Sequence, residues 1–585
     1  MACKGCALPA SPGRQGQKPV CMLLTLVFSL LLVVAALAFG LNRVAPTRRL
    51  GFAASAAVFA AAALMLLVPA RAVDQAPVEV LAPGGARFSF WPAPGAVERI
   101  VALALLGGGG MALLGLAGAT PPSVRGFGGV FAWATIALAG ALLSVVTPVF
   151  SMVQPLAWSV VALAGYGALR ASGATAQSEA PPLMVATGLG ASLALMVSLL
   201  VAGPDLIAGR LPAWPAAAGG ALAALGLAGC APLLSARDET ALAPAPLGAL
   251  IFGLAAPAAA LGWLLQSVAA LPSLPPAWGV TLGLTGGLGA LASAAGALDE
   301  RRLRPILNWT WGFQAALIVA AAGLAAPRGV EAGASLLLGL LLGSVVAASA
   351  AAILEQHTGS DDYTAVGGAP RVATAAWAIG MLVSLGLPPL WGFWGRLWFL
   401  QAAQEHQPWL AALTLAASVL LTLALLAPLA GLLSPARFPP RRGPWTDTVP
   451  LALAGSVLLG LGVAPQLVRV FWPGEAPIVP VIQGASIVAG MLLAGPGLLM
   501  ARAASGRSLE RDPDEELVSL APEGLGAALR PLSWLARPMP LLQGSWMILQ
   551  RASELLRVPL RLFEQRYYLL GVLAALLTIM LLMAR

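Results

Sequence analysis

Long apolar runs, separated by short polar or Pro- and Gly-containing segments, recur along most of the 585 residues. Each run is close to the roughly 20 residues that an α-helix needs to cross the hydrocarbon core of a bilayer. The pattern therefore predicts an all-α polytopic membrane protein with about 14–16 transmembrane helices. The predicted spans are residues 20–41, 51–69, 99–119, 127–147, 150–170, 183–203, 212–236, 245–271, 277–299, 304–326, 330–354, 370–402, 408–433, 447–465, 478–501 and 566–584.

Two stretches lack the spanning pattern. Residues 71–98 hold Pro, Gly and charges of both signs, which favours an extramembrane, hairpin-like loop. Residues 503–565 mix Arg with Leu and Trp and are interrupted by Pro, which is typical of short helices lying on a membrane surface. The predicted organisation is a tail (1–19), N-terminal helices (20–126), a transmembrane core (127–465), an additional helix (466–502), the surface segment (503–565) and a C-terminal helix (566–585).

Composition supports lipid as the solvent of this chain. Hydrophobic residues make up 59% and charged residues only 10%, whereas an ordinary soluble domain is about a quarter charged. The net charge of +9 is scattered over short loops without a basic stripe, which argues against nucleic acid as a partner. Loops after odd-numbered spans carry about twice the basic residues of the others, which places them in the cytoplasm together with residues 503–565. We expect a multi-pass protein of the cell (inner or plasma) membrane, in contact with lipids.

No catalytic, cofactor-binding or metal site is expected in this chain. Cys3 and Cys6 form a single C-x-x-C pair, which supplies only half the ligands of a tetrahedral zinc site. The two histidines, His357 and His406, lie at predicted span ends without a cluster of further ligands. Glycine-rich nucleotide-binding motifs are also absent from the sequence.

The most informative stretch lies inside the long span 370–402. Residues 384–396 read SLGLPPLWGFWGR. Pro388 and Pro389 each remove a helical N–H donor, and Gly386 permits close backbone approach. A helix broken at membrane depth must be covered by protein or line a water-filled cavity. The stretch therefore predicts a Pro-broken helix in a protein-lined interior.

This stretch resembles the SLxGxPPxxGFxGK block of the antiporter-like subunit family. That family includes the proton-pumping membrane subunits of NADH:quinone oxidoreductase (complex I), Mrp-type cation/proton antiporters and membrane-bound hydrogenase relatives. Residues 299–313 and 238–247 are similar to two further family segments. The resemblance implies inverted five-helix repeats and other membrane subunits as partners in a redox-driven, proton-translocating complex. Iron–sulfur, flavin or quinone groups would then belong to those partners.

The chain departs from the family at the positions where it carries buried charges. The resemblance implies a glutamate in the fifth helix and lysines or a histidine in the seventh, eighth and twelfth. Here the first three positions fall near Gln154, near Leu225 and near Phe313 or Gln314, and Arg396 matches the lysine of the family's block. The side chains at the first three positions do not titrate near neutral pH, and an arginine does not release its proton there. The chain therefore resembles a divergent member of the family, and its relay is predicted to be degenerate.

Three interpretations remain open at the level of sequence. The first is a subunit that acts as a scaffold or coupling element because its relay is lost. The second is a working proton or cation channel that uses water chains together with Arg396. The third is an unrelated polytopic membrane scaffold. The candidate proton-path or helix-break residues are Gln154, Asn308, Gln314, Gly386, Pro388, Pro389 and Arg396.

Overall fold

The computed structural model describes residues 17–68, 78–81, 87–90, 94–120, 127–173, 181–207, 214–229, 243–271, 275–298, 300–363, 370–433 and 445–463, and the isolated positions 529 and 531. All of them lie in one compact unit, residues 1–536. The predicted additional helix (466–502), surface segment (503–565) and C-terminal helix (566–585) lie outside the described elements, as does most of the tail 1–19.

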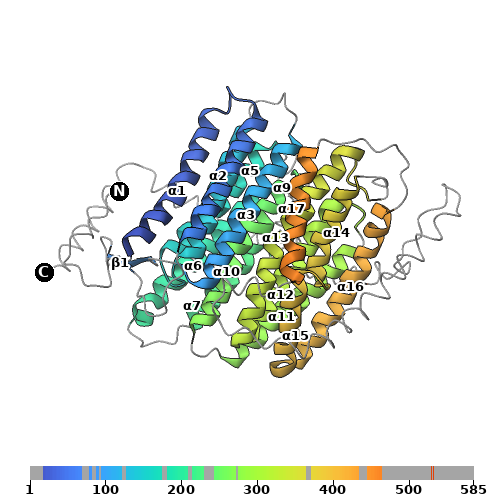
Figure 1. Cartoon of the computed structure of the whole chain (residues 1–585). Coiled ribbons are helices and arrows are strands. Elements are labelled where there is room, and N and C mark those ends of the chain that lie inside the picture. The colour runs from blue at the N-terminus through green and yellow to red at the C-terminus, as the bar shows by residue number, and fades with distance from the viewer. Residues whose placement is uncertain are drawn as a thin grey trace, which may run out of the picture. The chain divides into compact units, whose positions relative to one another are not determined.

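Figure 1 shows the described helices packed side by side with their axes roughly parallel. In chain order the elements are α1 (Gln17–Gly40), α2 (Thr47–Leu67), β1 (Val78–Leu81), β2 (Arg87–Phe90), α3 (Ala96–Ala119), α4 (Gly128–Val146), α5 (Val153–Ala171), α6 (Pro181–Ile207), α7 (Trp214–Ala228), α9 (Ala245–Gly248), η4 (Ala249–Ala255), α10 (Ala256–Ala270), α11 (Pro276–Leu298), α12 (Leu303–Gly323), α13 (Pro327–Thr358), α14 (Arg371–Leu385), α15 (Trp391–His406), α16 (Pro408–Leu433) and α17 (Trp445–Val463).

The predicted class of fold, an all-α polytopic membrane protein, is confirmed. Among the described residues, nine helices are long and apolar enough to cross a membrane. The apolar runs predicted between residues 20 and 465 each coincide with helix, and α4 and α5 are indeed separate helices. The strands β1 and β2 form a small antiparallel hairpin within residues 71–98. The predicted inverted five-helix repeats stay a prediction.

Small residues set the closest helix contacts. A Cβ added at Gly286 of α11 would overlap the backbone N of Ala320 in α12, and one at Gly323 would overlap the backbone of Gly283. Only residues without a Cβ at these positions permit the two helix backbones to approach so closely, as in other membrane helix pairs. The α11–α12 hairpin is therefore one tightly joined piece of the core.

The long span 370–402 is broken into α14 and α15, as predicted. The sequence places the break at the two prolines, but helix α14 ends before them, at Leu385. Gly386 adopts a left-handed conformation (φ 65°), and the N–H of Leu387 donates to the carbonyl of Leu382 at 3.2 Å. This is the Schellman pattern, in which a left-handed glycine terminates a helix. The prolines lie in the turn that follows, where their missing N–H groups break no helical bond.

Helix α13 is a continuous 32-residue helix that packs against both pieces of the broken span. A Cβ at Gly343 of α13 would lie 3.3 Å from the carbonyl of Gly380 in α14. Nearer the start of α13, the backbone N of Leu336 lies 2.9 Å from where a Cβ added at Gly395 of α15 would be. The broken span is therefore supported along its length by an unbroken neighbour.

A second irregularity lies in the span 245–271. Between α9 and α10 the chain forms a π-helix, in which the N–H of Ala256 donates to the carbonyl of Ile251. The next residue, Pro257, has no N–H to continue the ladder. This wide turn accommodates the proline inside a span that is wholly buried in the bundle.

Candidate functional site

Gln154, one of the candidate residues from the sequence, is fully buried in a complete hydrogen-bond network. Its Nε2 group donates to the backbone carbonyls of Ser144 (2.9 Å), Thr147 (3.0 Å) and Pro148 (3.5 Å). The Ser144 hydroxyl donates to Gln154 Oε1 at 2.6 Å. These carbonyls belong to the end of α4 and the non-helical link to α5, where intrahelical donors run out.

Two tryptophans extend this network to α10. The indole of Trp158 donates to the Ser144 hydroxyl at 3.2 Å, and that of Trp263 donates to the carbonyl of Val149 at 2.7 Å. The two rings meet edge to face, with centroids 5.7 Å apart. The α4–α5 link is thus held by side chains of α5 and α10.

The surroundings of Gln154 suit a neutral hydrogen-bond donor and would destabilise a negatively charged side chain. Three carbonyl oxygens converge on the position of Nε2, and each presents a partial negative charge. An ionised carboxylate at this place would face unpaired acceptors in a buried site. The arrangement therefore stabilises the non-helical link between α4 and α5. The Gln154 amide has no proton that it could exchange near neutral pH.

Gln314 and Arg396 are brought together around the break between α14 and α15. Gln314 donates from Nε2 to the carbonyl of Val383 at 3.4 Å, and Arg396 donates from Nη1 to the carbonyl of Leu385. The guanidinium carbon lies 5.2 Å from the ring centroid of Phe313. Arg396 therefore reaches back across the break to the C-terminal carbonyls of α14, where a cation is favoured by the helix dipole.

This second group leaves polar atoms without partners. The buried atoms Gln314 Oε1, Arg396 Nη2 and Ser335 Oγ have no hydrogen-bond partner among the described residues. Ser335 belongs to the same region, because its carbonyl accepts from the indole of Trp391 (3.0 Å) at the start of α15. Buried polar atoms of this kind are commonly satisfied by water.

The remaining predicted residues fall in two places. Asn308 is buried in α12, six residues before Gln314. Gly386, Pro388 and Pro389 form the turn of the break. In the part of the chain that the structure describes, no hydrogen bond or ion pair joins the Gln154 network to the Arg396 group. The predicted path residues are therefore two separate groups, and their transport role stays a prediction.

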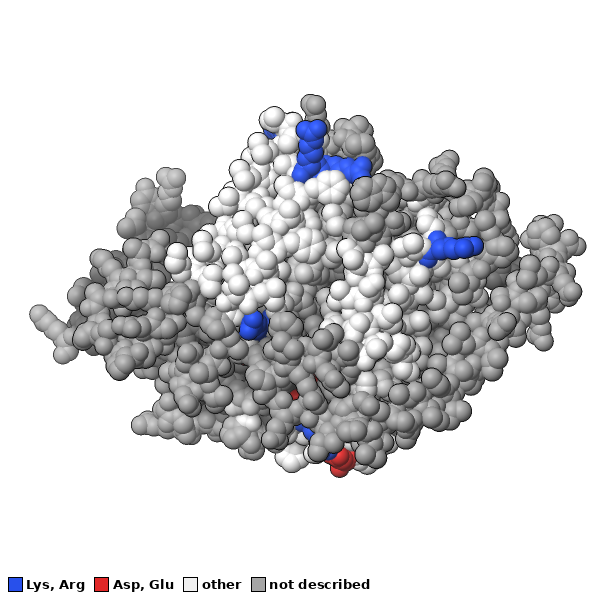
Figure 2. Space-filling view, in the orientation of Figure 1, with Lys and Arg blue, Asp and Glu red and all other residues white. Residues whose placement is uncertain are grey.

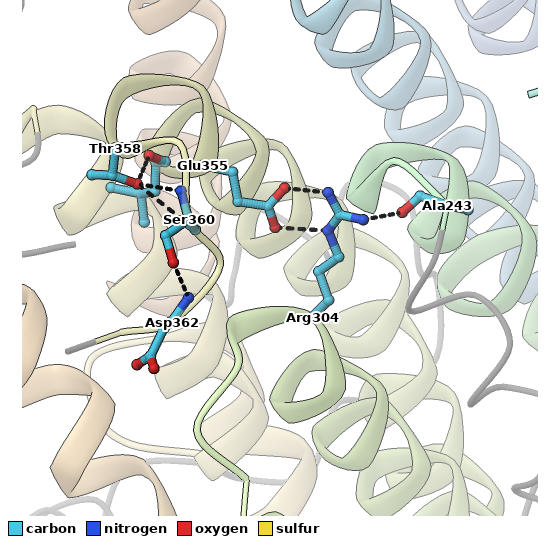
Figure 3. Close-up of polar contacts among 7 residues, drawn as sticks. Ala243, Arg304, Glu355, Thr358, Ser360 and Asp362 are labelled. Atoms are coloured by element: carbon cyan, nitrogen blue, oxygen red, sulfur yellow. Dashed lines mark hydrogen bonds and ion pairs between the residues drawn. The ribbon is translucent and has the colours of Figure 1, made fainter. Parts of the chain in front are cut away.

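The sequence analysis missed a two-point ion pair at the end of the bundle (Figure 3). Arg304 donates from Nε and Nη2 to the two carboxylate oxygens of Glu355, at 2.8 and 2.6 Å. Its Nη1 donates to the carbonyl of Ala243 at 3.0 Å. This pair ties the starts of α9 and α12 to the end of α13. In the sequence, Arg304 follows the ninth predicted span and Glu355 follows the eleventh. Both therefore lie on the same side of the membrane, which was the only sequence signal for their proximity.

The same end is joined further by the backbone. Leu303 donates to the carbonyl of Asp361 at 2.8 Å, and Tyr363 donates to the carbonyl of Arg301 at 3.2 Å. Burial raises the pKa of the Tyr363 phenol, an effect that Arg301 opposes and Asp362 assists. Residues 301–303 before α12 and residues 361–363 after α13 are therefore joined by backbone hydrogen bonds. No group of three or more His, Cys, Asp or Glu able to hold a metal is found among the described residues.

These features define a class: a polytopic helical membrane protein with a broken helix braced by a long continuous one. Residues 237–422 match the family model described as "NADH:quinone oxidoreductase/Mrp antiporter, TM". This match and the folds of solved structures confirm the resemblance to the antiporter-like subunit family. They oppose the interpretation of an unrelated scaffold. No curated protein matches the sequence.

Three solved structures share the fold. A chain of the Mrp complex from Dietzia sp. DQ12-45-1b is 20% identical with a TM-score of 0.66, and the match covers 96% of this protein but only 63% of that chain. A chain of the membrane-bound sulfane sulfur reductase, an archaeal respiratory membrane complex, is 18% identical (TM-score 0.69; 95% and 99% covered). A chain of respiratory complex I from Thermus thermophilus is 22% identical (TM-score 0.56; 76% and 98% covered).

Proposed function

We propose that this protein is an antiporter-like subunit of a larger membrane complex and acts as a scaffold or coupling element without autonomous proton pumping. The observation that carries the proposal is the Gln154 network. The amide of Gln154 is neutral and fully buried, and its polar atoms are all hydrogen-bonded to the end of α4 and to the α4–α5 link. The resemblance implies a glutamate near this position.

The distribution of ionisable groups supports the same conclusion. The only lysines of the whole chain are Lys4 and Lys18. Among described side chains, the carboxylates lie near helix ends or in loops, as do Glu331 and Glu355 of α13. Groups that titrate, or waters between such groups, are needed to carry protons through a membrane interior. The described bundle interior offers the fixed cation Arg396 in their place.

The solved structures with this fold suggest the partners. These chains come from an Mrp complex, a membrane-bound respiratory complex and respiratory complex I. We infer that other membrane subunits assemble with this chain and that redox cofactors belong to them. The ordered end formed by Arg304, Glu355 and the loop 360–363 is suited to transmit movement between helices, because it links three segments distant in sequence.

The proposal is tested by proton translocation per turnover of the assembled complex in proteoliposomes. Gln154→Ala and Arg396→Ala are compared with Ser456→Ala, whose hydroxyl is exposed and bonds only within its own helix. We expect unchanged proton stoichiometry in all three, and reduced assembly of the first two on native gels. A clean loss of pumping in either variant, with assembly intact, would contradict the scaffold function.

A working channel is the second candidate, because Gln314 Oε1 and Arg396 Nη2 are buried near the break without partners. Water that satisfies these atoms would supply part of a chain of hydrogen bonds. Proton flux through the purified protein in liposomes separates the two functions. Flux that Arg396→Ala abolishes would favour the channel, whereas a tight membrane would favour the scaffold.

A further inference from the structure

Helices α1 and α2 present a broad apolar face to the surroundings of the bundle. Exposed side chains on this face include Met22, Leu26, Leu32, Val33, Leu37, Phe52, Phe59 and Leu67. The apolar part of α1 runs for 19 residues, Met22–Gly40, which is about 28 Å at 1.5 Å per residue. This length equals the hydrocarbon thickness of a bilayer, roughly 30 Å. The face therefore has the height of a layer of lipid chains.

Arginines begin where this apolar face ends. In Figure 2, basic side chains gather at the end of the bundle where α1 is joined to α2. Arg43 and Arg49 are exposed there, and the guanidinium of Arg48 lies 5.5 Å from the ring centroid of Phe52. Leu41 and Val44, 43% and 72% exposed, lie among them. Guanidinium groups beside exposed apolar side chains are typical of the headgroup level of a membrane.

The α1–α2 turn, residues 41–46, carries Arg43 and leads directly into Arg48 and Arg49 at the start of α2; hydrogen bonds hold it in place. The backbone N of Gly128, at the start of α4, donates to Asn42 Oδ1 at 2.5 Å. Within the turn, Val44 and Ala45 donate to the carbonyl of Leu41 at 3.0 and 2.9 Å. A fixed turn presents its cations at less entropic cost than a flexible tail would.

Helices α1 and α2 themselves contain no carboxylate that could neutralise this turn. The first 73 residues of the chain contain neither Asp nor Glu. Neither Arg43 nor Arg49 forms an ion pair with any carboxylate in the described residues, in contrast to Arg304 and Arg328. Arg43 and Arg49 thus form a local excess of positive charge at headgroup height.

We propose that the α1–α2 turn binds the phosphate of an anionic phospholipid whose acyl chains lie along the exposed faces of α1 and α2. Guanidinium groups match phosphate oxygens in a two-point geometry. The apolar face next to Arg43 and Arg49 favours a lipid over an acidic protein segment, because a lipid satisfies both surfaces at once. The proposal does not depend on whether the chain conducts protons.

Binding is measured by native mass spectrometry of the full-length protein, or of its complex, in detergent titrated with phosphatidylglycerol or phosphatidylcholine. The wild type is expected to retain phosphatidylglycerol preferentially. The variant Arg43→Gln/Arg49→Gln is expected to lose that preference, with an affinity for phosphatidylglycerol lower by about tenfold or more. The matched control, Arg302→Gln/Arg371→Gln, removes two exposed charges of the described chain elsewhere and should change the affinity by less than about twofold.

Three results would overturn the proposal. One is equal retention of the two lipids by the wild type, and another is an equal loss of affinity in the test and control variants. The third is a photo-crosslinker at position 43 that captures a protein subunit instead of lipid in the native membrane. Thermal stability in lipid-free detergent shows whether a variant is folded, and both double variants should match the wild type there.

Discussion

At the scale of single residues, the partners of a buried polar group decide its role. All polar atoms of the Gln154 side chain are hydrogen-bonded, and these bonds stabilise the link between α4 and α5. Gln314 and Arg396 each keep one buried polar atom without a partner. The same residue type, glutamine, is thus a structural element in one half of the molecule and a candidate water ligand in the other.

Gln154→Glu is expected to lower the stability of the folded protein by about 1–3 kcal/mol at pH 8. The carboxylate would face the carbonyls of Ser144 and Thr147. A protonated carboxyl donates one hydrogen bond there, so the folded state favours the protonated form and stability falls as pH rises. Thermal unfolding in detergent at pH 5 and pH 8 measures this. A loss that is the same at both values, or no loss, would contradict the neutral-site argument; Gln154→Met is the pH-independent control.

The Arg304–Glu355 pair is expected to show coupling in a double-mutant cycle. Arg304→Gln and Glu355→Gln each leave a partly buried charge unpaired, because the side chains are only 26% and 12% exposed. Each should cost about 1–3 kcal/mol, and the double variant less than the sum. The Arg328–Glu405 pair, 61% and 49% exposed, is the control and should couple by less than about 1 kcal/mol. If the free-energy losses of Arg304→Gln and Glu355→Gln were strictly additive, the ion pair would not stabilise the fold.

At the scale of elements, the break between α14 and α15 depends on Gly386. Its φ of 65° disfavours a side chain, and an added Cβ would lie 3.0 Å from Arg396 Cδ and 3.1 Å from the carbonyl of Gly392. Gly386→Ala is expected to lower stability by about 1–2 kcal/mol, seen as a lower melting temperature. Gly107→Ala in α3, where a Cβ meets nothing within 4 Å, should be neutral or stabilising. Equal effects of the two substitutions would refute this account of the break.

At the scale of the whole molecule, the described arginines of one end of the bundle outnumber those of the other end. Arg43 in the α1–α2 turn, Arg49 at the start of α2 and Arg304 at the start of α12 lie at one end, whereas Arg328 and Glu405 belong to the opposite end. Cysteines introduced at Arg43 and Gln356, in a background without the native cysteines, should react with a membrane-impermeant thiol reagent from the cytoplasmic side only. A cysteine at Glu405 should react from the other side only. Labelling of Arg43 and Gln356 from opposite sides would exclude this topology.

Much of the fold was accessible from local sequence patterns. The apolar runs coincide with helices because run length and hydrophobicity are properties of a single segment in lipid. The broken helix was foreseen from Pro388 and Pro389, but its starting point was not, since the left-handed conformation of Gly386 depends on the turn as a whole. The π-helix at Ala249–Ala255 had no recognised signal beyond Pro257.

The sequence by itself determined the membrane class, the position of the described helices and the presence of a break within the span 370–402. The length of an apolar run, the missing N–H of a proline and the missing side chain of a glycine each act within one segment. Their effects can therefore be deduced from the sequence of that segment. Only the tertiary structure decided that Gln154 binds backbone carbonyls and that Arg304 meets Glu355, 51 residues away. Those partners lie on different segments, and the packing register of whole helices determines which polar atoms come within hydrogen-bond distance.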